Sequence, residues 1–131
     1  MTAQGKVQAV NINELKRYSP EMRVNQLLLN SNDFVTRMSC YESGQITPLH
    51  IHPNDDEVVF CVEGRGTVTF EERDAVPLVP GSLVSVPAGL AHRIEAAADS
   101  AMVVIYTTNA GYTTIRPESR DKGIPLPGER K

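Results

Sequence analysis

Residues 44–64 constrain the fold more than any other stretch of the chain. His50 and His52 are separated by one residue, so on a strand both imidazoles point from the same face. Residues 53–56, Pro-Asn-Asp-Asp, are turn formers that end this strand. Glu57 therefore opens a new strand, from which its carboxylate can face the two histidines. Two imidazoles and a carboxylate that converge on one point are typical of a first-row divalent metal site.

A second segment carries the remaining histidine. Residues 81–92 predict a short strand over Leu83–Val86, a Pro-Ala-Gly turn and a further strand, Ala91–Glu95, that includes His92. All three histidines of the chain fall in these two segments, which supports the interpretation of a metal site in a small β-barrel.

The two segments resemble the motifs of the cupin superfamily. The first motif, G(X)5HXH(X)4E(X)6G, is matched by Gly44, His50, His52, Glu57 and Gly64. The second, G(X)5PXG(X)2H(X)3N, is matched by Gly81, Pro87, Gly89 and His92, while Ala96 stands where the family usually has Asn. That Asn is not a metal ligand in the family, so this departure concerns local packing.

The resemblance implies an all-β fold, the double-stranded β-helix or jelly-roll barrel of cupins. It also implies that one divalent metal is held by His50, His52, Glu57 and His92. Imidazole and carboxylate ligands suit Fe, Mn, Ni, Co or Zn, and Fe(II) is the first expectation. Four protein ligands would leave coordination positions open for a substrate, water or dioxygen.

The rest of the chain also favours an all-β fold, because turn signals recur at short intervals and no long helical period is present. Further strands are expected over residues 23–29, 34–42, 57–62, 67–70 and 102–107, with a weakly signalled one over 6–10. A helical turn capped by Asn11 or Asn13 is expected over residues 11–18, and a charged loop over 71–74.

With 131 residues, the chain is expected to form a single domain. We expect an N-terminal arm over residues 1–21, a barrel core over about 22–108 and an extended tail over 109–131. The tail is rich in Pro, Gly and charge, which predicts either a frayed end or an arm lying on a partner subunit. The arm hypothesis rests on spaced apolar residues, Tyr112, Ile115, Ile124 and Leu126.

Composition excludes several kinds of partner. The net charge is -3 with both signs dispersed, which argues against nucleic acid. The apolar runs are too short to span a membrane, and no signal peptide is recognisable near Met1. Cys40 and Cys61 are too few for a disulfide scaffold, so a cytoplasmic protein with reduced thiols is expected.

Four residues are candidate substrate contacts. Arg37 and Tyr41 share the polar face of their strand. Burial preferences favour a polar face that meets water, and an apolar opposite face that meets the core. The alternative is that Arg37 and Tyr41 project into the barrel and bind an anionic or carbonyl-bearing substrate. Cys61 lies four residues after Glu57 and so shares its face of the strand; it either lines the cavity or is a small buried hydrophobe. Tyr106 either offers a hydroxyl to the pocket or packs in the core.

The first functional hypothesis is a metal-dependent enzyme acting on a small organic molecule, with dioxygenase-type chemistry implied by the resemblance to single-domain cupins. Its alternative is a non-redox lyase, isomerase or cyclase, in which Glu57 leaves the metal to move a proton. A non-catalytic metal-binding or ligand-binding module, and a structural protein with vestigial ligands, are the other classes. The family resemblance and the unprotected sheet edges predict a homodimer.

Overall fold

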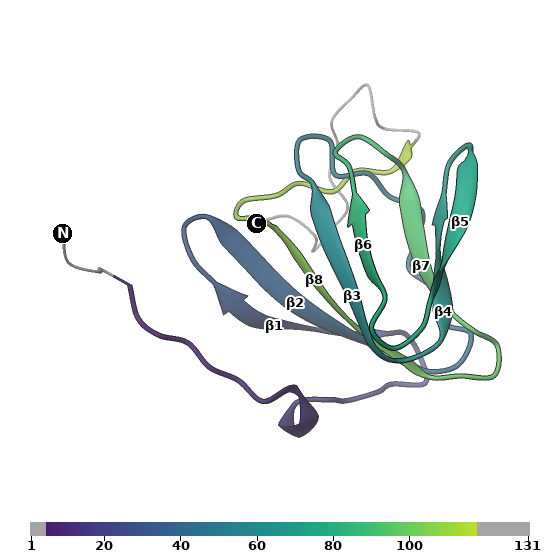
Figure 1. Cartoon of the computed structure of the whole chain (residues 1–131), viewed down its shortest axis with the longest axis horizontal. Coiled ribbons are helices and arrows are strands. Elements are labelled where there is room, and N and C mark those ends of the chain that lie inside the picture. The colour runs from purple at the N-terminus through teal and green to yellow at the C-terminus, as the bar shows by residue number, and fades with distance from the viewer. Residues whose placement is uncertain (1–4, 118–131) are drawn as a thin grey trace.

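A computed structural model describes residues 5–117, which form two antiparallel β-sheets (Figure 1). The five-stranded sheet contains, in spatial order, β1 (Val24–Asn30), β2 (Phe34–Tyr41), β8 (Met102–Asn109), β3 (Glu57–Gly64) and β6 (Leu83–Val86). The three-stranded sheet contains β5 (Arg73–Leu78), β4 (Gly66–Phe70) and β7 (His92–Ala96). This arrangement confirms the predicted all-β jelly roll.

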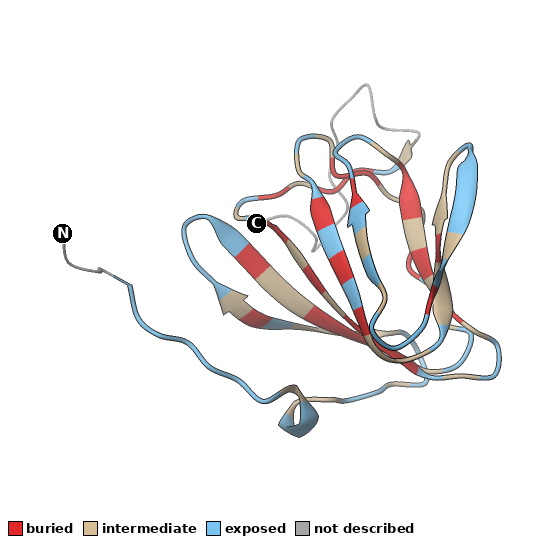
Figure 2. Ribbon diagram, in the orientation of Figure 1, coloured by how far each residue is buried: buried red, intermediate tan, exposed pale blue. Residues whose placement is uncertain are grey.

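The strands form because apolar side chains alternate with the sheet period. In β3, Val59 and Cys61 are fully buried, whereas Val58 and Phe60 are 43% and 38% exposed. Buried and exposed bands accordingly alternate along this strand (Figure 2). Burial of such an apolar side chain stabilises the fold by roughly 1.5–3 kcal/mol. The main core lies between the sheets and draws on both: Tyr41, Val59, Cys61, Val68, Leu78, Ile94, Ala96, Met102, Val104 and Tyr106.

A second apolar layer covers the outer face of the five-stranded sheet over β1, β2 and β8. Met38 and Cys40 are fully buried there against Ile12 and Leu15 of the N-terminal segment. The opposite, polar face of β2 points into the space between the sheets, where Ser39 is 1% exposed. The expectation that the polar face of β2 meets water is therefore wrong, because the N-terminal segment supplies apolar cover on the other side.

The glycine that closes the first motif has a packing role. Gly64 has a φ of +81°, and a Cβ atom there would lie 1.9 Å from the carbonyl oxygen of Ala101. Any side chain would be strained by the left-handed backbone and would also collide with the chain that leads into β8. Gly64 thus permits the close approach of β3 and β8.

Local elements differ from expectation at two places. Residues 6–10 are extended but form no strand, while the predicted helical turn is confirmed as a 3-10 helix, η1 (Ile12–Glu14), capped by Asn11. Residues 73 and 74 belong to strand β5 rather than to a charged loop. Strand β5 was not predicted. It contains Pro77, which is tolerated because β5 lies at a sheet edge.

The segment of the paired histidines does not form a regular strand. It makes isolated antiparallel bridges, from His50 to His92 and from Ile51 to Ile115. The backbones of His50 and His92 exchange two hydrogen bonds of 2.9 Å. The prediction of a regular strand at His50 and His52 is therefore wrong, because no continuous ladder of hydrogen bonds forms there. The single bridge still places His50 and His92 side by side.

The beginning of the predicted tail packs on its own chain. Tyr112 and Ile115 are 2% and 1% exposed, and Ile115 joins Ile51 in a small apolar cluster. These two residues are therefore not available as anchors for a partner subunit. The other proposed anchors, Ile124 and Leu126, lie outside the described residues.

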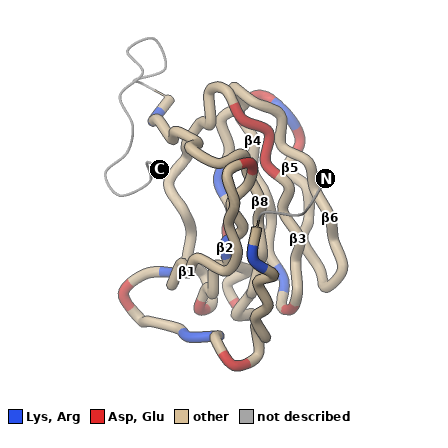
Figure 3. The backbone as a smooth tube through the Cα atoms, turned by 90° about the vertical axis from the view of Figure 1, so that its left-hand side faces the viewer, with Lys and Arg blue, Asp and Glu red and all other residues tan. Residues whose placement is uncertain are grey.

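Charges of both signs are interspersed along the tube in Figure 3, in line with the small net charge. Within residues 5–117, no helix has the length and apolarity needed to cross a bilayer.

Candidate metal centre

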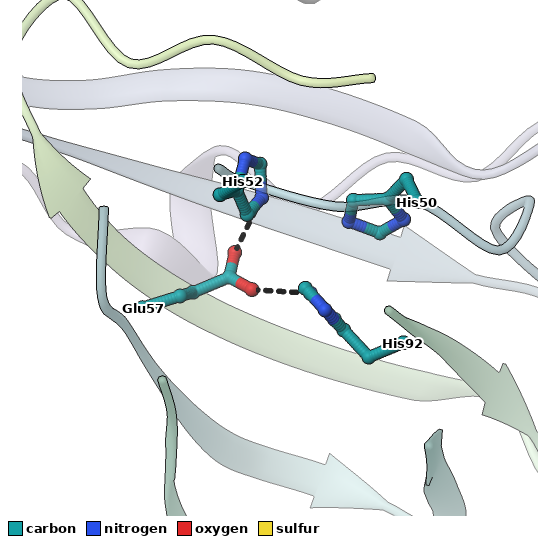
Figure 4. Close-up of side chains that lie close together, drawn as sticks. All are labelled: His50, His52, Glu57 and His92. Carbon is teal, nitrogen blue, oxygen red and sulfur yellow. Dashed lines mark hydrogen bonds and ion pairs between the residues drawn. The ribbon is translucent and has the colours of Figure 1, made fainter. Parts of the chain in front are cut away.

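Four side chains from separate parts of the chain converge between the sheets. Glu57 is the first residue of β3 and His92 the first residue of β7, while His50 and His52 come from the bridging segment (Figure 4). One ligand atom from each lies within 4.8 Å of the others. This is the set that the resemblance implied.

Backbone carbonyls orient the three imidazoles. The Nδ1 atoms of His50 and His92 lie 2.8 Å and 2.9 Å from the carbonyl oxygens two residues earlier in the chain. The Nδ1 atom of His52 lies 3.2 Å from the carbonyl oxygen of Thr113. Since a carbonyl can only accept, Nδ1 carries the proton in each ring, which leaves Nε2 as the metal-binding atom.

The carboxylate of Glu57 bridges two of the rings. Its Oε1 atom lies 2.9 Å from Nε2 of His92, and its Oε2 atom lies 3.8 Å from Nε2 of His52. Burial raises the pKa of Glu57, but the hydrogen bond to His92 and the fields of the three imidazoles outweigh it and leave the pKa below its usual range. Burial lowers the pKa of His92, and its hydrogen bond and attraction to Glu57 reverse that effect. Burial and the neighbouring His92 lower the pKa of His50 to about 3.

The donor set fits one divalent transition metal. His52, Glu57 and His92 are each at most 4% exposed, and burying charged groups is costly unless they are paired or coordinate a metal. Three nitrogen donors and one oxygen donor match the preferences of Fe, Mn, Co, Ni and Zn. A cation at their centre would be held by Nε2 of each histidine and by the carboxylate.

Three members of the cluster, His50, His52 and Glu57, line a cavity of about 430 Å³, counted with its open mouth. Tyr41 and Tyr106, both predicted as substrate contacts, line this cavity. Further lining comes from Arg23, Ser39, Thr47, Pro48, Ile94, Tyr112 and Thr114.

Two other predicted contacts lie elsewhere. Arg37 is not among the residues that line the cavity, and its Nη1 atom donates to Oδ1 of Asn25 at 3.2 Å. Cys61 packs in the main core, with its Sγ atom 3.6 Å from the carbonyl oxygen of Glu63. Neither side chain is brought to the cavity.

Arg23 is the lining cation that sequence analysis missed. Asn25 pairs with Ser39 across β1 and β2, so Arg23, two residues before Asn25, shares the interior face. The Nη1 atom of Arg23 donates to Oγ of Ser39 at 2.9 Å. Strand periodicity alone could have placed Arg23 and Asn25 on one face, but the pairing of β1 with β2 was needed to turn that face inward.

The chain after β8 completes the site. The hydroxyl oxygen of Thr114 lies 3.1 Å from Nδ1 of His52, and the ring of Tyr112 meets the ring of His52 edge-on with centroids 5.3 Å apart. These contacts were also missed, because residues beyond Asn109 were assigned to a tail by composition.

Comparison with known proteins accords with this geometry. The model of the cupin domain family matches residues 37–108, more than half of the chain. The chain belongs to the cupin family. A protein with a double-stranded beta-helix domain from Klebsiella pneumoniae subsp. pneumoniae superimposes with a TM-score of 0.74 at 17% identity, covering 85% of this cupin and 99% of that chain. TT1209 from Thermus thermophilus gives a TM-score of 0.73 at 24% identity, covering 79% and 97%.

One curated relative has a named activity. Acireductone dioxygenase of Bacillus cytotoxicus is 37% identical over 70 residues. The match spans 49% of this cupin and 41% of the length of that enzyme.

Proposed function

We propose that this cupin is a mononuclear metal-dependent enzyme that acts on a small organic molecule by dioxygenase-type chemistry. The observation that carries the proposal is the convergence of His50, His52, Glu57 and His92, the first three of which line a cavity. The partial similarity to a dioxygenase supports the redox form of the chemistry. Fe(II) is the metal we propose first, since it accepts this donor set and leaves coordination positions open.

A bound metal of this kind supplies a Lewis acid and a site where substrate and dioxygen can meet. The side chains of the protein supply hydrogen bonding and proton transfer. The phenol of Tyr41, whose pKa burial raises to about 12, stays protonated at neutral pH and can donate a hydrogen bond to a substrate oxygen. Glu57 is the one carboxylate among the described lining residues, so we propose it as the group that moves a proton.

The test combines metal analysis with oxygen uptake. The purified protein, loaded with Fe(II), is offered a panel of enolisable ketones and diketones in an oxygen electrode. We expect about one metal ion per chain and substrate-dependent oxygen consumption. His50→Ala should lose both the metal and the activity.

Each alternative outcome has a defined meaning. Product formation without oxygen uptake would assign the non-redox lyase, isomerase or cyclase chemistry. Stoichiometric metal without turnover of any compound would favour a binding module. Equal metal content in native protein and His50→Ala would refute the metal site itself.

A further inference from the structure

One buried hydroxyl in the wall of the fold has no hydrogen-bond partner among the described residues. Thr108 in β8 is 3% exposed, and its Oγ1 atom is the unpartnered one. Burying an unpaired hydroxyl costs free energy, and valine has the same shape without that cost. A buried hydroxyl at such a cost indicates a role in the surrounding site.

The cross-strand neighbour of Thr108 is the carboxylate residue of the metal cluster. Thr108 lies directly opposite Glu57 in the pairing of β8 with β3, and the two side chains of such a pair leave the same face of the sheet. That face is the interior one, because Val59 and Tyr106, the pair two residues further along the same strands, belong to the main core.

Thr108 and Glu57 are the polar members of a row of four side chains. Strands β2, β8, β3 and β6 contribute Val35, Thr108, Glu57 and Val86 in register, and each is at most 4% exposed. The flanking valine side chains offer neither a donor nor an acceptor. Thr108 is also not among the described residues that line the cavity, so a ligand bound there is not its partner. Within this row, Glu57 is the acceptor beside the hydroxyl.

Metal binding would release an oxygen of that carboxylate from its present partners. The Oε1 atom of Glu57 lies 2.9 Å from Nε2 of His92, and the Oε2 atom lies 3.8 Å from Nε2 of His52. These nitrogens are the atoms that would hold a metal, since the Nδ1 atom of each ring lies against a carbonyl oxygen. A carboxylate bound to the metal through one oxygen would have its other oxygen buried without a histidine donor, and a buried charged oxygen needs a hydrogen bond.

We propose that Thr108 is a positioning residue for Glu57, and that its hydroxyl donates to the carboxylate oxygen that does not bind the metal. This inference rests on the proposed metal site and adds a supporting contact to it. Hydrogen bonds of this kind orient metal ligands and tune the metal. By holding one oxygen of Glu57, Thr108 keeps the carboxylate from taking a second coordination position, which stays open for a substrate.

Thr108→Val tests the proposal, because valine keeps the shape of the side chain and removes the hydroxyl. The affinity for Co(II) is measured by competition with a chromophoric chelator, and the visible spectrum of the Co(II)-loaded protein is recorded. We expect Thr108→Val to bind Co(II) about ten- to a hundredfold more weakly, with altered visible bands. Thr108→Ser keeps the hydroxyl and should retain the native bands and most of the affinity.

Two further measurements separate this role from a purely structural one. In excess chelator, the urea midpoint of Thr108→Val should equal or exceed that of the native protein, because the unpaired hydroxyl is removed. Thr107→Val is the matched control, since Thr107 is the adjacent residue of β8 and its hydroxyl oxygen lies 2.9 Å from that of Thr36. Thr107→Val should bind Co(II) with the native affinity and the native bands.

A packing role would give a different set of results. The inference is overturned if Thr108→Val unfolds at a lower urea concentration without metal, or if Thr108→Ser binds Co(II) as weakly as Thr108→Val. If the native protein binds no Co(II), the proposed metal site fails and this inference fails with it. If the native protein and Thr108→Val bind Co(II) equally, the metal site stands and only the role of Thr108 is refuted.

Discussion

The Nε2 atom of His92 lies 2.9 Å from the Oε1 atom of Glu57, and the two residues open strands that belong to different sheets. This contact joins the two layers of the fold at the candidate metal centre. The same side chains would therefore serve both the packing of the sheets and the coordination of an ion. A substitution of either residue should therefore weaken metal binding, and activity should fall as a consequence.

Glu57→Gln should weaken metal binding by more than about a hundredfold, since changes to residues that only support metal ligands already cost 10–100-fold. The measurement is a competition titration with a chromophoric chelator. Glu63→Gln is the matched control, because Glu63 lies on the same strand but its carboxylate pairs with Lys16 at 2.7 Å. Equal affinities of the two variants would contradict the role of Glu57.

Thr114→Val should weaken metal binding by about tenfold, because it removes the hydroxyl that lies 3.1 Å from Nδ1 of His52. Thr113→Val is the control, since Thr113 contacts His52 through its backbone carbonyl, which the substitution retains. The same chelator competition compares them. An unchanged affinity in Thr114→Val would show that the hydroxyl does not support the ligand.

Metal binding should release a proton from His92. The attraction of Glu57 outweighs the effect of burial and raises the pKa of His92 above 6.5, so near pH 6 the metal-free protein carries a proton on Nε2 that the metal must displace. Affinity should therefore rise with pH and level off above the raised pKa. Calorimetry in buffers of different ionisation enthalpy should give about one proton per metal near pH 6 and fewer near pH 8. A proton count that is the same at both pH values would contradict this.

In the metal-free protein the same pair makes stability depend on pH. The raised pKa of His92 contributes stability that is present below pH 6.5 and lost as the pH rises through the folded value. The lowered pKa of Glu57 contributes stability that is present above pH 4.5 and lost as the pH falls through the folded value. The lowered pKa of His50 has the opposite effect to that of His92, because below pH 6.5 the unfolded state binds a proton that the folded state excludes, so stability falls as the pH falls there. Urea unfolding of the metal-free protein should therefore show a maximum at about pH 6.5 or just above, and Glu57→Gln should reduce the decline on its alkaline side.

Ile115→Ala should destabilise the protein by about 2–5 kcal/mol, because the side chain is 1% exposed and packs against Ile51. Val7→Ala removes part of an aliphatic side chain that is 99% exposed, and should change stability by less than about 0.5 kcal/mol. Urea unfolding measures both. If Ile115→Ala left the free energy of unfolding almost unchanged, the packing of this segment would be contradicted and the frayed end predicted from the sequence would stand.

The homodimer stays a prediction that sedimentation equilibrium can test. Phe60 and Leu83 are paired on neighbouring strands and are 38% and 69% exposed on the outer face of the five-stranded sheet. Apolar side chains gathered on one face favour association. A monomer at all concentrations would contradict the prediction, and a dimer unaffected by Leu83→Ser would place the interface elsewhere.

The sequence by itself predicted the fold class and the four side chains of the candidate metal centre. The motif resemblance implied the jelly roll and the full set of four residues. Short-range spacing supported three of these residues, since His-X-His, the turn after it and the strand that Glu57 opens are decided within a few residues of backbone. The second motif likewise places His92 just after its Pro-Ala-Gly turn.

Only the tertiary structure decided which other side chains share the cavity. Arg23 and Thr114 reach it because β1 pairs with β2 and because residue 115 bridges to residue 51, and both are contacts between distant parts of the chain. Composition likewise could not show that the N-terminal segment buries Met38 and Cys40 and so turns the polar face of β2 inward. Strand periodicity says which residues share a face, but the direction of that face depends on what packs against each side.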